Sequence, residues 1–364
     1  MRSQATIQIF EGPGSLRLTT RALPWDLAAG ELLVEISLAA ICGSDLHTID
    51  GRRSEPTPAI LGHEGIGTVT AIGPGSAAAA GHPAIGDRIT WTIANSCFEC
   101  RFCTDLQLPE KCLSLFKYGH ASLQDGSGLN GTFASHVLLR SGTHVVPLPD
   151  HVSDAVAVPA NCALATAVNA VSHLPEQCPV VVVQGAGILG LYACALLDER
   201  RQRCGIDHIF CVDVDESRLA LVERFGATPI RGDLAQDEEL ITAAAPHGVD
   251  AVLELAGAPQ LVPVGIRLLR AGGFYSLVGM VHPDSALEIT GEQIIRKCLT
   301  LRGVHNYSPV HLDEAVAFLA RTVDRYPFEA LISPAFPLAQ LNEAIEAAAQ
   351  RLYPRISLRP QLEE

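Results

Sequence analysis

Four cysteines lie close together in the sequence, and their spacing is that of a metal site. Two residues separate Cys97 from Cys100 and Cys100 from Cys103, and eight residues lie between Cys103 and Cys112. Zn²⁺ binds four thiolates in a tetrahedron, and two-residue gaps let neighbouring cysteines converge on one ion. Four thiolates leave no position for water, so we expect a structural zinc here. Unrelated free thiols are the alternative interpretation.

A glycine-rich segment follows an apolar run and precedes a second apolar run of helical character. Its first glycine permits a tight turn, its second lets the backbone approach a pyrophosphate, and its third lets the helix pack closely. The helix N-terminus would offer N–H groups and a positive dipole to phosphates. The segment predicts a dinucleotide site, and a glycine-rich turn that binds nothing is the alternative. The candidate residues are Gly185, Gly187, Ile188, Leu189 and Gly190.

An acidic residue stands where the next strand is expected to end. Asp213 lies 23 residues after Gly190. A carboxylate at this place binds the hydroxyls of the adenosine ribose and repels a 2′-phosphate. Residues 214–216 add negative charge and no arginine, so the sequence favours NAD over NADP. Arg218 is a further candidate for cofactor binding.

The elements that must position these residues divide the chain into two parts. Up to about residue 155, short β-like runs alternate with Gly and Pro, as at 31–41, 64–73 and 131–139. From about residue 160, apolar strands alternate with helices, which indicates a parallel, doubly wound sheet. We expect strands at 179–184, 208–214, 250–255 and 273–279, and late helices within 311–323 and 341–352.

Composition excludes several classes of protein. The 364 residues are 48% hydrophobic and 18% charged, unlike a disordered chain. A net charge of −14 without a basic cluster argues against a nucleic-acid partner. Charges, Gly or Pro interrupt the apolar runs before about 18 residues, so we expect no membrane span. The N-terminus lacks an apolar signal-peptide core, and we expect a cytoplasmic protein.

Two further motifs and a distant cysteine complete a recognisable set. Cys42 opens the segment CGSDLH (42–47), His63 lies in GHE (62–64), and Cys162 lies in NCALAT (161–166). With the four-cysteine segment and the glycine-rich loop, they resemble the zinc-dependent medium-chain alcohol dehydrogenases over essentially the whole chain. The resemblance implies that Cys42, His63 and Cys162 hold a catalytic zinc with a fourth position open.

The same resemblance implies roles for neighbouring residues. Glu64 matches a carboxylate that can approach the metal, and Asp45 matches the residue that hydrogen-bonds the ligating histidine. Ser44 would accept the alcohol proton and pass it to His47, because imidazole titrates near neutrality. Thr166 would place a hydroxyl against the nicotinamide. The activity implied is hydride transfer between an alcohol, or its aldehyde or ketone, and NAD.

The resemblance also implies an α/β architecture with two domains. A β-rich GroES-like catalytic domain would span 1–160 and 306–364, with the structural zinc lobe at about 97–112. A Rossmann NAD-binding domain would span 161–305, with the active site in the cleft between them. Relatives pair through the last strand of the Rossmann sheet, near 299–304 here, so we expect a homodimer or homotetramer.

The chain departs from the family pattern at three places. The family has seven residues between the third and fourth cysteines of the lobe, and this chain has eight. Gly43 replaces a basic residue that some members use to hold the pyrophosphate. Arg355 lies near a phosphate-binding arginine of some members, and a solvated charge in the tail is the alternative interpretation.

The substrate is the least determined part of the prediction. Segments 44–53, 111–120, 160–166 and 302–307 resemble a bacterial branch associated with phosphonate catabolism. A phosphonate-bearing alcohol would need cationic or N–H-rich recognition, for which the candidates are Arg52, Arg53, Lys117, His120 and His305. A solvated loop is the alternative for the two arginines.

Three other functions remain open. A polyol or sugar-alcohol dehydrogenase is one, although many such members use a glutamate where this chain has Cys162. A dehydrogenase of cyclic secondary alcohols is another. A zinc- and nucleotide-binding protein without activity is the third, and the intact Ser44, His47, Glu64 and Thr166 argue against it.

Overall fold

A computed structural model describes residues 3–24, 26–75, 83–232, 235–282 and 284–360. The chain forms two compact units, each described here by itself. Unit 1 comprises Met1–Cys162, Ser308–Val323 and Phe328–Glu364, and unit 2 comprises Ala163–Tyr307 and Asp324–Pro327.

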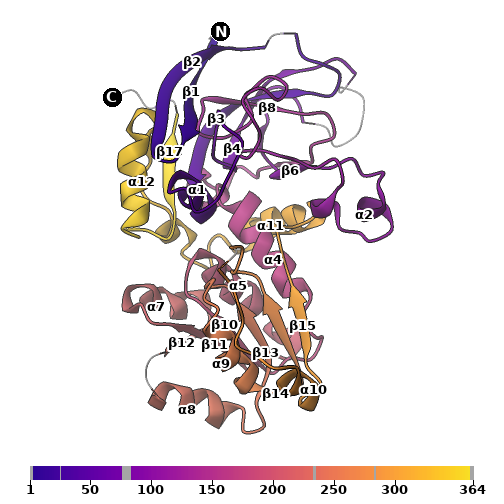
Figure 1. Cartoon of the computed structure of the whole chain (residues 1–364), viewed down its shortest axis with the longest axis vertical. Coiled ribbons are helices and arrows are strands. Elements are labelled where there is room, and N and C mark those ends of the chain that lie inside the picture. The colour runs from indigo at the N-terminus through magenta and orange to yellow at the C-terminus, as the bar shows by residue number, and fades with distance from the viewer. Residues whose placement is uncertain (1–2, 25, 76–82, 233–234, 283, 361–364) are drawn as a thin grey trace. The chain divides into compact units, whose positions relative to one another are not determined.

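Unit 1 is built on a seven-stranded sheet in which β3 (Leu32–Ile41) is central and pairs with β4, β8 and β17. Most of β3 is buried, which agrees with its long apolar run. A separate hairpin is formed by β1 (Gln4–Gly12) and β2 (Ser15–Ala22). The other strands of the large sheet are β4 (Glu64–Ile72), β5 (Arg88–Trp91), β8 (His136–Leu139), β9 (Val145–Pro147), β16 (Phe336–Pro337) and β17 (Ile356–Arg359) (Figure 1).

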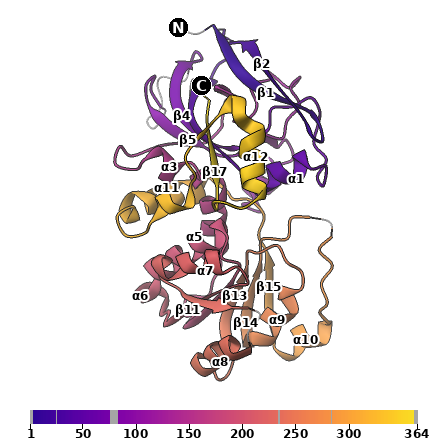
Figure 2. The same ribbon diagram turned by 90° about the vertical axis from the view of Figure 1, so that its left-hand side faces the viewer.

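The expected strands at 31–41 and 64–73 are therefore present, whereas the run 131–139 forms only the short β8. The two late helices are also present, as α11 (Pro309–Thr322) and α12 (Leu341–Ala349). The tail after α12 returns as β17, and α12 lies against it (Figure 2). The sequence analysis did not predict this strand, which brings the end of the chain to β3.

Three short helices and a small two-stranded sheet complete the parts of unit 1 that bear on function. The helix α1 (Gly43–Ile49) follows β3 directly, and α3 (Asp154–Ala157) precedes the boundary between the units. The segment that carries α2 (Arg101–Thr104) leaves the sheet as an excursion in Figure 1. The pair of β6 (Ala94–Asn95) and β7 (Phe116–Lys117) closes the base of that excursion.

Unit 2 contains the predicted parallel, doubly wound sheet. Its strand order is β12-β11-β10-β13-β14-β15, and every pairing is parallel. This order reverses direction between β10 and β13, and such a reversal is where an open α/β sheet binds its ligand. The strands are β10 (Val180–Gln184), β11 (His208–Asp213), β12 (Thr228–Arg231), β13 (Val249–Glu254), β14 (Leu269–Leu277) and β15 (Thr300–Gly303).

The expected strands of unit 2 lie at β10, β11, β13 and β14, although β14 begins at Leu269 rather than at residue 273. The strand β12 and the helix α8 were not predicted, because β12 is short and contains Pro229. The helices of the unit are α4 (Ala165–Ser172), α5 (Ile188–Glu199), α6 (Arg201–Cys204), α7 (Glu216–Val222), α8 (Ala235–Ala244), α9 (Leu261–Leu268) and α10 (Gly291–Arg296).

One helical stretch among the described residues is long and apolar enough to cross a membrane by length and composition. It is Asp154–Ser172, and 78% of its most apolar window is buried inside the structure. Such burial is typical of a core helix in a soluble protein, so this stretch is weak evidence for a membrane segment.

Candidate active site

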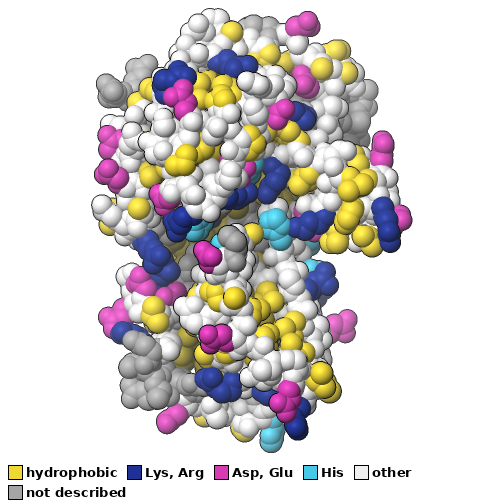
Figure 3. Space-filling view, in the orientation of Figure 1, with side chains coloured by type: hydrophobic (Ala, Val, Ile, Leu, Met, Phe, Trp, Pro, Cys, Tyr) yellow, Lys and Arg dark blue, Asp and Glu magenta, His cyan; other side chains and the backbone are white. Residues whose placement is uncertain are grey.

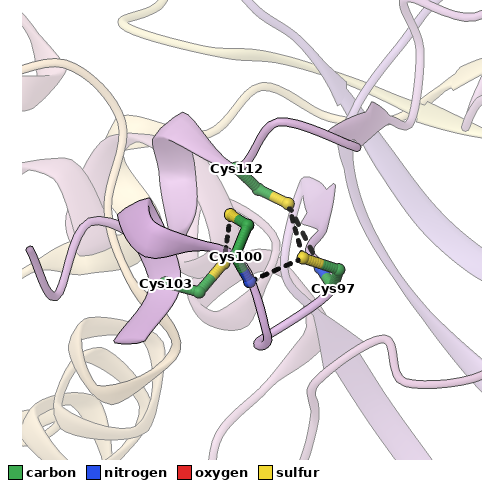
Figure 4. A group of neighbouring side chains, drawn as sticks. All are labelled: Cys97, Cys100, Cys103 and Cys112. Atoms are coloured by element: carbon green, nitrogen blue, oxygen red, sulfur yellow. Dashed lines mark hydrogen bonds between the residues drawn. The ribbon is translucent and has the colours of Figure 1, made fainter. Parts of the chain in front are cut away.

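The four cysteines of the excursion around α2 converge (Figure 4). Their sulfur atoms lie within 4.8 Å of one another, with 3.4 Å between Cys97 and Cys112 and 3.6 Å between Cys100 and Cys103. A left-handed residue, Phe98, turns the chain between the first two cysteines, and α2 begins directly after Cys100. The eight residues between Cys103 and Cys112 are thus accommodated without separating the sulfur atoms.

Backbone N–H groups favour the thiolate form at two of these four cysteines. Backbone N–H groups of Leu113 and Cys103 lower the pKa of Cys100 to about 6, and those of Glu99 and Cys100 lower the pKa of Cys97. Burial and Cys100 instead raise the pKa of Cys103 to about 12. Four thiolates cannot coexist at neutral pH without a cation, and a tetrahedral set of four sulfur ligands fits zinc. We find a structural zinc-type site, as expected.

A second cluster contains the other three predicted ligands. The ligand atoms of Cys42, His63, Glu64 and Cys162 all lie within 4.8 Å of one another. Cys162 Sγ is 3.4 Å from His63 Nε2 and 3.9 Å from Cys42 Sγ. Two thiols, an imidazole and a carboxylate form a donor set that suits zinc, and three of them with one open position form the set of a catalytic site.

The members of this cluster come from three separate elements. Cys42 caps the N-terminus of α1, and His63 and Glu64 stand at the start of β4. Cys162 lies in a π-helical turn, Ala160–Leu164. A π-turn inserts one extra residue into a helix and is common at functional sites. Here it lies beside Cys42 and His63, which belong to distant parts of the chain.

The side chain of Arg355 reaches into the second cluster from the residue that precedes β17. Its Nε and Nη2 lie 3.0 and 2.7 Å from the two oxygens of Glu64, and Nη2 lies 3.7 Å from Cys42 Sγ. Arg355 and Glu64 are 7% and 0% exposed, so this is a buried, two-point ion pair. The interpretation of Arg355 as a solvated tail charge is therefore wrong. Its guanidinium is instead paired with the Glu64 carboxylate.

The charged groups of the second cluster shift one another's pKa values. The hydrogen bond with Cys162 and the nearby Arg355 hold the pKa of Cys42 well below its usual value, against the effect of burial. Burial disfavours the charged form of His63, but Asp45 and Cys42 raise its pKa to about 10. Burial raises the pKa of Glu64 to about 8, although Arg355 opposes the shift. In this cluster the negative sulfur thus faces positive groups, and a bound metal cation would replace the proton on His63.

Asp45, Ser44 and His47 all lie on α1, directly after Cys42. Asp45 Oδ1 is 3.4 Å from His63 Nδ1, and Asp45 Oδ2 accepts a hydrogen bond from the Cys42 backbone N–H at 2.8 Å. One carboxylate therefore orients two members of the cluster. Ser44 and His47 are three residues apart on the helix and share one of its faces. Both are partly exposed.

Asn161, for which the sequence predicted no role, fixes the backbone on both sides of the second cluster's ligands His63 and Glu64. Its Nδ2 donates to the backbone carbonyls of His63 and Trp91, each at 3.0 Å, and its Oδ1 accepts from the Gly65 N–H at 3.4 Å. The residue is fully buried. A polar residue directly before Cys162 in an apolar run was the only signal in the sequence.

In unit 2, the glycine-rich loop has the geometry that its spacing predicts. Gly185 has φ +106°, and a Cβ on it would lie 2.9 Å from Ala256. A Cβ on Gly190 would lie 1.8 Å from the Gly185 carbonyl, so α5 packs directly on the loop. A Cβ on Gly187 would meet no atom within 4 Å, and no side chain caps α5 there. The open space and the free helix start fit a pyrophosphate.

Asp213 ends β11 beside this loop. Its Oδ2 accepts from the Ala186 N–H at 2.7 Å, and its Oδ1 accepts from the N–H groups of Val214 and Asp215. Arg218 lies 3.8 Å from Asp213 and 3.7 Å from Asp215. Thr166 lies near the start of α4 and is partly exposed. A carboxylate has about four acceptor positions, so Asp213 can still accept from ribose hydroxyls.

The candidate cations for the substrate are mostly paired. Arg52 is exposed and lies 2.7 Å from Asp50, whereas Glu55 lies 2.8 Å from Arg53 and 2.9 Å from His120. The His120 ring stacks on the His63 ring with centroids 5.2 Å apart. Burial lowers the pKa of His120 to about 4, so it is neutral. His305 is exposed, in unit 2.

Lys117 differs from these candidates. Among the described residues its ammonium makes no hydrogen bond, although it interacts electrostatically with Arg53, Glu55 and Cys162. Burial lowers its pKa. Lys and Arg side chains, with histidines, gather along the lower part of unit 1 on the face drawn in Figure 3.

Comparison with known proteins agrees with this geometry. The alcohol dehydrogenase GroES-like domain matches residues 28–150, and the zinc-binding dehydrogenase family matches residues 189–321. The first match confirms the expected GroES-like character of the β-rich part. Both metal clusters of unit 1 and the dinucleotide loop of unit 2 belong to the features that such proteins combine.

Three relatives are similar over nearly their whole length. The 5-exo-hydroxycamphor dehydrogenase of Pseudomonas putida is 30% identical, over 91% of this chain and 92% of its own. The D-arabitol-phosphate dehydrogenase of Enterococcus avium is also 30% identical, over 87% and 86%. An alcohol dehydrogenase structure from Thermotoga maritima superposes with a TM-score of 0.89, at 28% identity, over 98% of this chain and 100% of its own.

None of these comparisons distinguishes a phosphonate-associated branch, and they agree on the wider family. With two cysteine-rich metal sites and a Rossmann sheet in place, the chain belongs to the zinc-dependent medium-chain alcohol dehydrogenases, and it is a zinc-containing, NAD(P)-dependent oxidoreductase of alcohols.

Proposed function

We propose that this enzyme oxidises an alcohol with NAD, or reduces the corresponding carbonyl, at the cluster of Cys42, His63 and Cys162. The observation that carries the proposal is the convergence of these three ligand atoms from distant segments, with Glu64 tied to Arg355. Three ligands leave a position for substrate. A zinc ion bound there supplies a Lewis acid toward the substrate oxygen, and NAD supplies the hydride acceptor.

The residues around the cluster hold it in one geometry. Asp45 orients the His63 ring and the start of α1, so the imidazole presents Nε2 toward Cys162. Asn161 fixes the backbone of His63 and its own neighbour Cys162. Hydrogen-bonding groups behind the ligands orient them and tune their basicity.

In this proposal, two side chains of α1 carry the proton of the alcohol to solvent. The Ser44 hydroxyl accepts it and donates its own proton to His47, one helical turn further along. Imidazole titrates near neutral pH and can release the proton to water. Both residues are partly exposed, as a relay that ends in solvent requires.

The adenosine ribose distinguishes NAD from NADP. We infer a preference for NAD, because the Asp213 carboxylate ends β11 beside the dinucleotide loop, where it would repel a 2′-phosphate, and it accepts hydrogen bonds from three backbone N–H groups that hold it there. Arg218 lies within 4 Å of both Asp213 and Asp215, so its charge is shared with these carboxylates.

For the substrate, we propose an alcohol that carries a phosphonate or phosphate group. Lys117 supports this proposal, because it is a largely buried cation without a hydrogen-bond partner among the described residues and interacts electrostatically with the zinc ligand Cys162. Arg53 is neutralised by Glu55, so Lys117 leaves one net positive charge in this group. A similar protein named for an arabitol phosphate also favours an anionic substrate.

Two observations keep neutral substrates as the second candidate. The camphor-alcohol dehydrogenase is equally identical to this chain, and its name describes a neutral cyclic secondary alcohol. Phe133, which is buried and apolar, lies against Gly62, the residue before His63. Polyols are disfavoured because Cys162 stands where many polyol members use a glutamate. Loss of activity is disfavoured because the Ser44 and His47 relay is intact.

The substrate assay uses pairs of alcohols. Each phosphonate- or phosphate-bearing alcohol is tested beside its neutral isostere, with zinc-replete protein, by NADH formation. The proposal predicts a higher kcat/KM for the charged member, and Lys117→Met should remove the difference while Lys111→Met should not. A preference for the neutral member in the native protein would reject the anionic substrate and leave the dehydrogenase chemistry standing.

We further propose a cytoplasmic homodimer or homotetramer. Free thiols at both clusters require a reducing compartment. The last strand of the unit 2 sheet, β15, lies at an edge of that sheet and can pair with a second copy. Sedimentation equilibrium tests the assembly, since a monomer at micromolar concentration would contradict it.

A further inference from the structure

A buried carboxylate joins two loops at the carboxyl end of the unit 2 sheet. Glu254 is the last residue of β13 and is 0% exposed. Its Oε1 accepts hydrogen bonds from the N–H groups of Gly257 at 2.6 Å and Ala258 at 3.3 Å, and its Oε2 accepts from Gly279 at 3.0 Å. Gly257 and Ala258 follow β13, whereas Gly279 follows β14. One side chain therefore fixes both loops.

The two loops meet backbone to backbone. A Cβ on Gly279 would lie 2.4 Å from the Gly257 nitrogen, and Gly257 itself has φ +73°. His282 lies further along the second loop, and its Nε2 is 3.2 Å from the Gly257 carbonyl. The loops therefore meet closely, and the Glu254 carboxylate is the acceptor that binds backbone N–H groups of both.

This junction adjoins the dinucleotide loop. A Cβ on Gly185 would lie 2.9 Å from Ala256, and the Leu255 N–H donates to the Gln184 carbonyl at 2.9 Å. In a sheet of this strand order, each half binds one nucleotide across the point of reversal. The half with β10, β11 and β12 carries Gly185 and Asp213 for the adenosine side. The loops that Glu254 joins belong to the other half.

Burying a carboxylate at Glu254 costs free energy, which indicates a role beyond packing. A carboxylate without water is unfavourable unless several donors satisfy it, and here three N–H groups do so. Burial still raises the pKa of Glu254 above its ordinary value. A hydrophobic residue would avoid this cost if the strand needed only packing, and the proton relay and the metal clusters make no use of Glu254.

We propose that Glu254 is a positioning residue for the nicotinamide half of the cofactor. By holding loops 255–258 and 278–282, it shapes the part of the site that takes the nicotinamide ring, and leaves the adenosine half to Gly185, Gly187 and Asp213. The inference rests on the proposed use of NAD.

The test compares two ligands that differ only in the nicotinamide. NADH and ADP-ribose share the adenosine, both phosphates and the second ribose. Glu254→Gln keeps the shape but replaces one acceptor oxygen with an NH2 group, which cannot accept from an N–H. NADH fluorescence and calorimetry with ADP-ribose give the two dissociation constants, with Glu292→Gln, an exposed carboxylate on α10, as the control.

Glu254→Gln should weaken NADH about tenfold, or about 1.4 kcal/mol, and change the ADP-ribose affinity less than about twofold. Glu292→Gln should change neither. An equal loss for both ligands, or no loss for either, would overturn the positioning role. Failure of the native protein to bind either ligand would overturn both the use of NAD and this role.

Hydrogen exchange on the native protein gives a second test that does not depend on a variant's folding. NADH should protect the amides of 255–258 and 278–282 more than saturating ADP-ribose does, while both protect 185–190 equally. Equal protection of all three segments by the two ligands would contradict the proposal.

Discussion

Arg355 and Glu64 form a buried, two-point ion pair that joins the tail of the chain to the cluster of zinc ligands, with contacts of 2.7 and 3.0 Å. They are 291 residues apart. We propose that the pair determines which groups bind the metal. With Glu64 held by the guanidinium, Cys42, His63 and Cys162 would remain as the three ligands, and the fourth position would stay open for substrate.

Arg355→Met should therefore change both stability and metal binding. Removing one partner of a buried pair costs about 3 kcal/mol or more, because the other charge stays buried. The released Glu64 can become a fourth zinc ligand, so zinc should leave more slowly to a chelator and activity should fall. Urea unfolding and the rate of zinc release measure the two effects.

Two controls make this prediction specific. Arg321→Met breaks the exposed pair with Glu314 and should cost less than about 1 kcal/mol. Adding Glu64→Gln to Arg355→Met should restore rapid zinc release. Unchanged zinc release in Arg355→Met would show that Arg355 does not keep Glu64 from the metal.

Two glycines of the dinucleotide loop should respond differently to the same substitution. Gly187→Ala adds a methyl group to open space, so the protein should fold normally but lose at least tenfold, about 1.4 kcal/mol, in NADH affinity. Gly190→Ala forces a methyl group against the Gly185 carbonyl and should lower the melting temperature. Thermal unfolding and NADH titration separate these effects, and normal NADH binding by Gly187→Ala would place the pyrophosphate elsewhere.

His47→Ala should lower kcat/KM about 10²-fold at neutral pH, the range for general acid–base groups. The loss should be much smaller at high pH, where hydroxide can take the proton. A pH profile of the oxidation rate measures this difference, with the exposed His247→Ala as control. An equal loss at every pH would remove His47 from the relay.

Asp213→Gly should raise the dissociation constant of NAD about tenfold, because a hydrogen bond from the ribose to the charged carboxylate is lost, at about 1.5 kcal/mol. It should also reduce the preference for NAD over NADP, since the charge that repels a 2′-phosphate is gone. Parallel titrations with both cofactors measure it. An unchanged preference would mean that another residue contacts the ribose.

The sequence was most informative where function depends on local spacing. Cys97, Cys100 and Cys103 converge because short gaps force them to, and Gly185 and Gly190 act within a single strand-turn-helix unit. The alternation of strands and helices after residue 160 likewise predicted the parallel, doubly wound sheet of unit 2. Such features need few contacts between distant segments, so a pattern along the chain is sufficient to identify them.

Residues whose role depends on tertiary contacts were not predictable in this way. Arg355 reaches Glu64 only because residues 356–359 add a strand to β3, and a four-residue strand in a polar tail leaves a weak signal. Asn161 and Glu254 satisfy backbone groups of other loops, which a sequence does not reveal. The roles of Cys42, His63 and Cys162 came from resemblance to a family, and the structure brings their ligand atoms together.

We propose that two separate zinc sites exist and that the site with Cys162 performs the chemistry. Metal analysis, NADH titration and NADH formation from alcohols on Cys162→Ala and Cys112→Ser test it most directly, with the exposed Cys298→Ser as control. Cys162→Ala should keep one zinc, fold normally, bind NADH and form no product. Cys112→Ser should lose the other zinc and stability while its remaining zinc stays catalytic. Two zincs and full activity in Cys162→Ala would show that Cys162 does not hold a catalytic zinc.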